Sequence, residues 1–145
     1  MNKVEGIGDV INALEAIGAN IKGKELQQIM RNQGQKVIND ARSLVPVNTG
    51  DLRDSIGFIT GKDEKNQDKV LIGLRKQFYN HYLGVMYEYG TEPRIQDKTG
   101  RYTGVIEPRP FMRPALDKNK QSIVTGVQQG ITKLVLSLAK KYKLQ

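Results

Sequence analysis

The spacing of apolar residues predicts helices toward both ends of the chain. Apolar positions within residues 10–17 recur at helical spacing and predict a short first helix. A longer apolar stripe over residues 26–44 predicts a second helix, which ends before Pro46 because a proline pushes the residue before it out of the helical region. A third stripe predicts a long final helix over residues 111–142, with lysines at its end that suit the helix dipole.

Two strands and a short helix are predicted between these helices. Residues 56–58 alternate apolar with polar or small positions, and residues 70–74 alternate again, as half-buried strands do. The polar run 61–68 between them indicates a hairpin connection. Residues 79–89 fit a short helix better than a strand, and Gly90 is expected to end it.

A turn and a helix cap are predicted just after Pro46. The tetrapeptide Asn48-Thr49-Gly50-Asp51 is typical of a turn. The hydroxyl of Thr49 is expected to accept a hydrogen bond from the backbone N–H of Leu52, so that a single helical turn follows over residues 52–54.

Residues 92–107 lack strong periodicity and lie in the region that holds four of the five prolines. The tripeptide Lys98-Thr99-Gly100 is a candidate hairpin tip, with residues 102–106 as one arm. Long loops in compact domains are usually functional or disordered. We therefore predict a mobile loop at 92–107 that orders when the subunit is assembled.

The order of the elements favours an α+β fold. Strands gather in the middle and helices stand at both ends, so we expect an antiparallel sheet with the N-terminal helices and the long C-terminal helix packed on one face. The length of 145 residues fits a single domain, 1–145. Gly126 and Gly130 are expected to weaken the final helix locally.

Composition narrows the chemistry available to the chain. The absence of cysteine excludes disulfides and thiolate chemistry, and with one histidine little remains for a structural metal site. No window is apolar enough for a membrane span, and the N-terminus lacks a signal layout, so we expect a soluble intracellular protein. The net charge of +8 favours contact with nucleic acid or acidic proteins, although its even spread also suits ordinary solubility.

No catalytic pattern stands out. His81 lies among tyrosines and is better interpreted as a surface or interfacial histidine than as a general base. Asp51, Asp54 and Glu88 lack the spacing of a metal loop, and we expect them to pair with arginines or to cap a helix. Phosphate-binding and nucleotide-binding glycine patterns and a nucleophile elbow are absent from the sequence. We predict a protein that is not an enzyme and needs no cofactor or metal.

Three short segments carry more specific information. They are Val45-Pro46-Val47-Asn48-Thr49-Gly50-Asp51-Leu52-Arg53-Asp54-Ser55-Ile56, then Tyr87-Glu88-Tyr89-Gly90-Thr91, then Pro108-Arg109-Pro110-Phe111-Met112-Arg113-Pro114-Ala115-Leu116. In this order they resemble the small tail-completion, or head–tail joining, proteins of long-tailed double-stranded-DNA bacteriophages. The match falls on Pro46, Thr49, Gly50, Leu52, Arg53, Ser55 and Ile56, on residues 87–91, and on Pro110, Phe111, Pro114 and Ala115. The loop at 92–107 is longer and more basic than that family usually carries.

The resemblance implies a structural role at the head–tail junction of the virion. It implies a homo-oligomeric ring, expected to be six-fold, that meets the head-closing neck protein on one side and the tail tube or terminator protein on the other. Assembly would take place in the host cytoplasm, from a phage or prophage gene. Non-specific contact with DNA is compatible with this position, and no membrane is involved.

The candidate interface residues are charged and belong to these segments or to the loop between them. They are Arg53, Glu88, Arg94, Lys98, Arg101, Arg109 and Arg113. Basic residues of the loop are expected to dock against an acidic neighbour, and Arg53 and Glu88 are interpreted either as an ion pair or as ordinary surface charges. Thr49 and Gly50 are expected to form the turn, and Leu52, Ile56 and Phe111 to lie in the core.

Two other functions remain open at this point. A tail terminator is also a small α+β ring subunit, and the sequence separates it poorly from a joining protein. A small basic nucleic-acid-binding protein would instead use the net charge of +8, and its sign would be tight binding to duplex DNA with a steep salt dependence.

Overall fold

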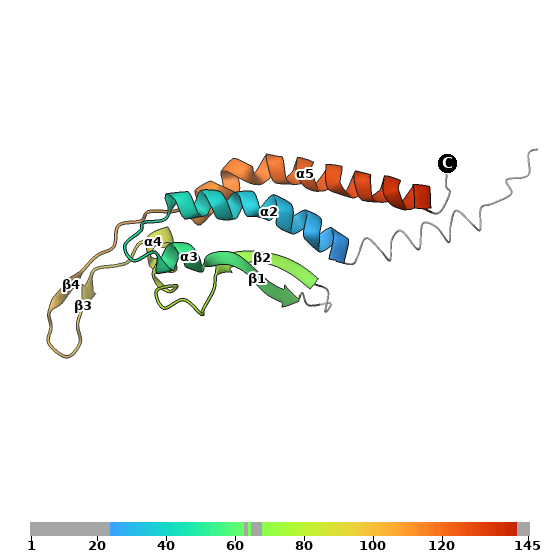
Figure 1. Cartoon of the computed structure of the whole chain (residues 1–145). Helices are drawn as coiled ribbons and strands as arrows, with labels where there is room; N and C mark the ends of the chain where they lie inside the picture. Colours follow the sequence, from blue (N-terminus) through green and yellow to red (C-terminus); the bar gives the residue numbers. More distant parts are fainter. Residues whose placement is uncertain (1–23, 63, 65–67, 142–145) are drawn as a thin grey trace, which may run out of the picture. The chain divides into compact units, whose positions relative to one another are not determined.

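The structure is a computed structural model that describes residues 24–62, 64 and 68–141. Its helices and strands follow the chain in the order α2 (Lys24–Leu44), α3 (Asp51–Ser55), β1 (Ile56–Lys62), β2 (Asp68–Leu74), α4 (Leu83–Tyr89), β3 (Arg94–Ile95), β4 (Tyr102–Gly104) and α5 (Met112–Lys141) (Figure 1). The two long helices, the hairpin and the short helix before Gly90 confirm the elements predicted from the sequence. The first helix predicted at residues 10–17 lies outside the described residues.

The described residues fall into two compact parts. Residues 34–121 form the larger part, and residues 24–33 together with 122–141 form the smaller part. The elements are mixed α and β with antiparallel pairing, which confirms the predicted fold class. The strands make two separate two-stranded sheets, β1–β2 and β3–β4. That residues 1–145 form one domain stays a prediction.

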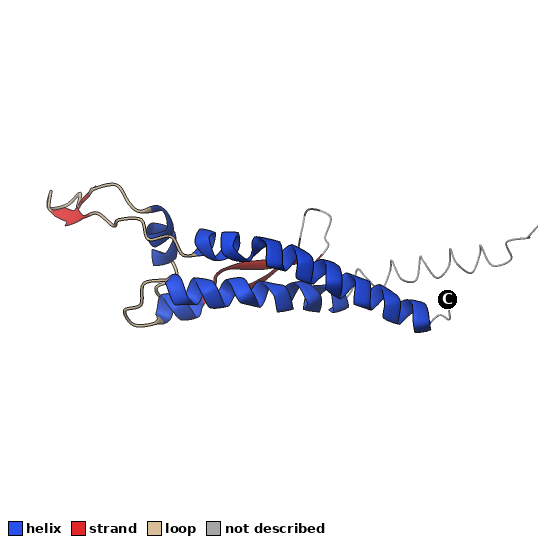
Figure 2. Ribbon diagram, turned by 90° about the horizontal axis from the view of Figure 1, so that it is seen from above, coloured by secondary structure: helices blue, strands red, loops and turns tan. Residues whose placement is uncertain are grey.

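In the larger part, helical residues cover one face of the β1–β2 hairpin. Phe58 is paired with Ile72 across the antiparallel register, and both side chains meet Gly34 of α2. A Cβ added at Gly34 would lie 3.0 Å from Cδ1 of Ile72 and 3.1 Å from Cε1 of Phe58, so this glycine lets α2 lie close to the sheet. Figure 2 shows this portion of α2 and the start of α5 above the two strands.

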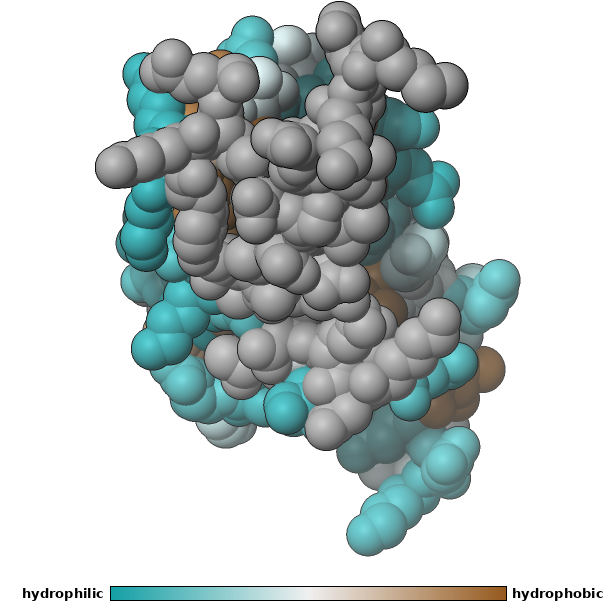
Figure 3. Space-filling model, turned by 90° about the vertical axis from the view of Figure 1, so that its right-hand side faces the viewer, coloured by the Kyte–Doolittle hydropathy of each residue, from teal (hydrophilic) through white to brown (hydrophobic). Residues whose placement is uncertain are grey.

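The core of the described chain lies entirely in the larger part. Its buried apolar residues come from the helices, the corner after α2 and the start of β1: Val37, Ile38, Ala41, Val45, Leu52, Ile56, Phe111 and Ala115. The predicted core positions of Leu52, Ile56 and Phe111 are therefore confirmed. In the view of Figure 3 the described surface is mostly hydrophilic, with small hydrophobic areas between.

A polar contact ties α5 to α2 within the larger part. The carboxylate of Asp40 accepts a hydrogen bond from Nδ2 of Asn119 at 2.6 Å and pairs with Nζ of Lys118 at 3.2 Å. The hydrogen bond from Asn119, followed by that from Lys118, lowers the pKa of Asp40. Asn119 is itself buried, and its Nδ2 also donates to the carbonyl of Ala115. The bonds to Asp40 and to Ala115 therefore satisfy the amide nitrogen of Asn119, which the core encloses.

The smaller part is a pair of helical segments that meet at two glycines of α5. An added Cβ at Gly130 would lie 2.6 Å from Cγ2 of Ile29, and one at Gly126 would collide with the amide of Gln33. These glycines therefore allow the close approach of the segment 24–33. Their role in packing goes beyond the local weakening of the helix that the sequence suggested.

Residues 92–107 form an arm built around the β3–β4 hairpin. Arg94 pairs with Gly104 and Ile95 with Tyr102, and the backbone N–H of Gln96 donates to the carbonyl of Arg101 at 2.8 Å. The turn between them contains Gly100 at a φ of 63°, which confirms the hairpin tip predicted at residues 98–100. In Figures 1 and 2 the hairpin stands clear of α4, α3 and the β1–β2 sheet. The mobility of the arm stays a prediction.

Within the described ranges, none of the helices combines the length and the apolar character needed to cross a bilayer.

Candidate functional site

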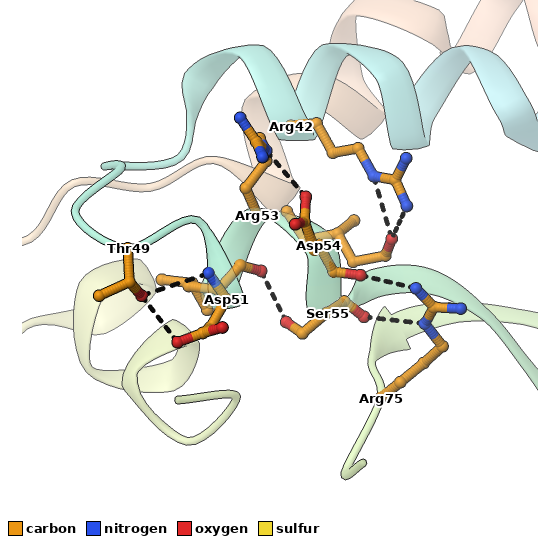
Figure 4. A network of polar contacts seen from close by, with 9 residues as sticks. Arg42, Thr49, Asp51, Arg53, Asp54, Ser55 and Arg75 are labelled. Carbon is orange, nitrogen blue, oxygen red and sulfur yellow. Dashed lines mark hydrogen bonds and ion pairs between the residues drawn. The ribbon is translucent and has the colours of Figure 1, made fainter. Parts of the chain in front are cut away.

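The first motif segment folds into a tight corner between α2 and β1 (Figure 4). Gly50 precedes α3 with a φ of 94°, a left-handed conformation that side chains rarely adopt. The predicted hydrogen bond from the N–H of Leu52 to Thr49 is wrong. The Thr49 hydroxyl instead donates to Oδ2 of Asp51 at 2.7 Å and accepts from the N–H of Asp51 at 3.4 Å, because Gly50, and not Thr49, occupies the N-cap position of α3.

Two arginines satisfy the carbonyl groups where α3 ends and β1 begins (Figure 4). Arg75 donates to the carbonyls of Asp54 at 2.6 Å and Ser55 at 3.3 Å. Arg42 donates twice to the carbonyl of Ile56, at 2.7 and 3.2 Å. Cations at the C-terminal end of a helix also complement its dipole, so the corner is held from both sides by charge-assisted hydrogen bonds.

Arg53 lies on the exposed side of this corner. Its Nε donates to Oδ1 of the neighbouring Asp54 at 2.9 Å. This bond is the main cause of the lowered pKa of Asp54 and of the raised pKa of Arg53. Arg53 therefore pairs with Asp54, and its interpretation as the ion-pair partner of Glu88 is wrong because Glu88 is used elsewhere.

Glu88 joins the second motif segment to the third. Its carboxylate accepts hydrogen bonds from the backbone N–H groups of Phe111 at 2.8 Å, Met112 at 3.0 Å and Arg113 at 3.0 Å. These groups lie at the start of α5, where N–H groups have no partner within the helix. Partial burial raises the pKa of Glu88, but the three hydrogen bonds together outweigh it and lower the pKa. The expectation that this carboxylate caps a helix is confirmed.

Hydrogen bonds between residues 87–91 and residues 106–109 close the base of the arm. The N–H of Thr91 donates to the carbonyl of Ile106 at 3.0 Å, and the N–H of Ile106 donates back to Oγ1 of Thr91 at 3.0 Å. One step further, the N–H of Arg109 donates to the carbonyl of Tyr87 at 2.6 Å. Gly90, with a φ of 74°, fits closely against Pro108. The arm therefore leaves α4 and returns to α5 through a fixed base.

A groove of about 710 Å³ lies in the larger part between β2, α4 and the start of α5. Its lining includes the buried side chains of Val37 and Phe111. Four large apolar or aromatic residues that line it are exposed to solvent: Leu71 (38%), Val85 (59%), Tyr89 (67%) and Leu116 (50%). Contiguous exposed apolar residues of this kind mark interaction sites.

The structure brings some of the predicted interface residues together and leaves others apart. Glu88 and Arg113 both line the groove, and the guanidinium of Arg113 lies 5.9 Å from the ring centroid of Tyr89. Arg94 lies on the arm with Nη1 4.0 Å from Sδ of Met86 in α4. The remaining basic residues of that set, apart from Arg53, are exposed on the arm or at its base: Lys98, Arg101 and Arg109.

Sequence reasoning missed the groove itself, because its lining residues come from four separate elements. The tyrosines within residues 79–89 were the sequence feature that could have indicated an interaction surface there.

His81 hydrogen-bonds through Nδ1 to the carbonyl of Phe78 at 2.8 Å and packs edge-on to Tyr82. In the portion of the chain that the structure describes, His, Asp and Glu side chains do not gather in a group of three suited to a metal ion.

Comparison with known proteins supplies one match. A family model described as "Bacteriophage HK97-gp10, putative tail-component" matches residues 8–109 of the chain. These residues include the corner, α4 and the whole arm. No curated protein and no solved structure matches the chain.

Proposed function

This chain belongs to the HK97-gp10-like family of bacteriophage tail components, and from that premise we propose that it joins the DNA-filled head to the tail. The family gives the chain a structural role in a phage, and a tail component belongs to the virion. Within the virion, we propose that copies of the chain form a ring, expected to be six-fold. The ring lies between the head-closing neck proteins and the tail tube or its terminator protein.

The observation that carries this proposal is the exposed apolar surface of the larger part. Leu71, Val85, Tyr89 and Leu116 stay exposed around one groove, and the arm exposes three more large apolar or aromatic residues. A subunit that works alone gains nothing from leaving these residues in water, whereas a subunit of an assembly buries them against its neighbours. Tyr89 and Arg113 lie close together at this groove, and tyrosine and arginine are both enriched at interfaces.

The carboxylates of the motif segments support a role in assembly without catalysis. Glu88 is occupied by three backbone N–H groups, and Asp54 by Arg53. Both have lowered pKa values, whereas a general base or acid that works near neutral pH needs a raised one. Their hydrogen bonds explain these residues as parts of the fold.

Electron microscopy of particles made by the phage without this gene tests the proposal. We expect DNA-filled heads to accumulate beside free tails of normal length, and joined virions to return when the gene is supplied from a plasmid. Tails of abnormal length would instead indicate a tail terminator. Intact, infectious virions would overturn the structural role, and tight, salt-sensitive binding of the purified protein to duplex DNA would then favour nucleic-acid binding.

A further inference from the structure

We infer that the arm of one copy of this chain docks into the groove of the next copy. The inference rests on the proposed function, because it supplies the contact between neighbouring subunits of the ring. It commits to residues 92–107 of a second copy as the occupant of the groove lined by β2, α4 and the start of α5.

The groove follows the outer edge of β2. Residues whose side chains alternate between the two faces of the sheet, from Val70 to Leu74, all line it. The N–H of Arg75 donates a hydrogen bond to the carbonyl of Ser55, just before the first pair of the register, Ile56 with Leu74. Because hydrogen-bonded and non-hydrogen-bonded pairs alternate along an antiparallel ladder, this bond shows which pairs of the register are hydrogen-bonded. It follows that the backbone N–H and C=O groups of Val70, Ile72 and Leu74 point outward, away from β1.

This edge is open, unlike the start of β1. The outward carbonyl of Ile56 on β1 is taken up by Arg42, whereas the backbone bonds among the described residues do not reach the outward groups of β2. An exposed strand edge is a template for another strand, and an extended segment added there would place alternate side chains in the apolar groove. The groove is therefore suited to an extended segment with apolar residues.

The arm supplies such residues on two short strands. Ile95 (64% exposed), Tyr102 (60%) and Val105 (44%) are its large apolar or aromatic residues that the subunit leaves uncovered. Tyr102 lies on the short strand β4, directly across from Ile95 on β3, and β4 ends at Gly104 with a φ of 94°. The two surfaces therefore match in chemistry.

The arm of the same copy does not fill the groove. Its base is closed by the bonds between Thr91 and Ile106 and between Arg109 and Tyr87, and from this base the hairpin stands clear of the sheet (Figure 1). Since the base fixes its direction, the exposed residues of the arm are presented outside their own subunit. We therefore assign the groove to the arm of a second copy.

Charge is compatible with the same pairing. Between Arg94 and Gly104 the arm carries three basic residues and one acidic residue. The groove lining itself carries one residue of each sign, Glu88 and Arg113, and α5 exposes Asp117 directly after Leu116. A basic arm therefore meets no excess of positive charge in the groove.

The arm and the groove are different patches of one chain, so their pairing is heterologous. Heterologous contacts repeat head to tail and close into a ring when the rotation between copies allows it. The inference therefore predicts that each copy both donates an arm and receives one.

Photo-crosslinking in phage particles tests the inference directly. A phage is grown with Tyr102→p-benzoylphenylalanine in this protein, and the purified particles are illuminated. We expect a product of about twice the subunit mass of 16.3 kDa, linked to residues 70–74, 85–89 or 111–116 of a second copy. The matched control carries the same group in place of Tyr79, which is 82% exposed and lies off both surfaces, and should not give this product.

The other outcomes separate the two proposals. Links to a different phage protein, or within one chain, would overturn the docking of the arm on a second copy while leaving the head–tail function in place. Absence of the protein from particles that are otherwise complete would overturn the proposed function itself.

A paired substitution provides a second test. Val85→Lys puts a charge into the groove at an exposed position, so the variant should fold with an unchanged urea midpoint. We expect the yield of joined virions to fall at least tenfold when it replaces the natural protein. Leu136→Lys, at a residue of α5 that has similar exposure (57%) and does not line the groove, is the control and should keep the yield. Equal yields from the two variants would contradict the inference.

Discussion

The base of the arm and the arm itself differ in where their groups find partners. At the base, polar groups are satisfied within the chain: Glu88 takes up three backbone N–H groups, and Thr91 and Ile106 bond to each other twice. Along the arm, large side chains such as Tyr102 have little to contact within the subunit and stay 60% exposed. The difference separates residues that hold the fold together from residues whose burial has to come from another molecule.

The largest expected effect comes from the core beneath the groove. Phe111 is fully buried and its side chain helps to line the groove. We expect Phe111→Ala to lower the free energy of unfolding by about 3–5 kcal/mol, because it removes a large buried side chain and leaves a cavity. Urea denaturation followed by circular dichroism measures the change. A loss below about 1 kcal/mol would mean that the groove collapses easily and is not a fixed surface.

The next effect tests the base of the arm. Glu88→Ala leaves three N–H groups at the start of α5 without their acceptor, and we expect a loss of about 2 kcal/mol. The isosteric control Glu88→Gln keeps one acceptor oxygen and should lose about half as much. If the two variants were as stable as the natural protein, the base would not depend on this carboxylate, and the contrast with the arm would fail.

The sequence predicted the local elements well because their signals lie within a few residues. Stripes at helical spacing, the alternation around Phe58 and Ile72 and the Lys98–Gly100 tip each depend on neighbours in the chain. The use of Glu88 could be foreseen only as a choice between pairing and capping, because its partners stand 23 to 25 residues away, beyond the arm. Gly130 was interpreted as a weak point, since only the packed structure shows Ile29 against it.

In the smaller part, two glycines of α5 differ in the side chains that lie against them. A Cβ at Gly130 would press on Cγ2 of Ile29, a branched side chain with little freedom, so we expect Gly130→Ala to destabilise by about 1 kcal/mol in spite of its better helix propensity. Gly126→Ala is the matched control. There the amide of Gln33 can swing away, and its Oε1 has no hydrogen-bond partner to lose.

We therefore expect Gly126→Ala to leave stability unchanged or to raise it by up to about 1 kcal/mol. Thermal denaturation of the two variants side by side checks the order. A reversed order would show that the segment 24–33 does not pack on these glycines.

A pH titration gives a smaller effect with a defined sign. The pKa of Glu88 is lowered in the folded chain, so its contribution to stability is present above its ordinary value of 4.5 and is lost as the pH falls through the folded pKa. Below pH 4.5 the natural protein should therefore lose stability more steeply than Glu88→Gln, which has no proton to take up. Parallel slopes in urea denaturation between pH 5 and pH 3 would contradict the role of the three hydrogen bonds.

The smallest expected change in stability is on the arm. Tyr102 is 60% exposed and lies beyond the hydrogen-bonded base, so Tyr102→Ser should change the free energy of unfolding by less than about 0.5 kcal/mol. The same urea experiment that detects Phe111→Ala measures it, which makes the two variants a direct comparison of the core with the arm. A loss above about 1 kcal/mol would mean that the arm packs on its own subunit. An unchanged midpoint would leave the tyrosine without a function in folding, and its large aromatic surface would then be explained by contact with a neighbour.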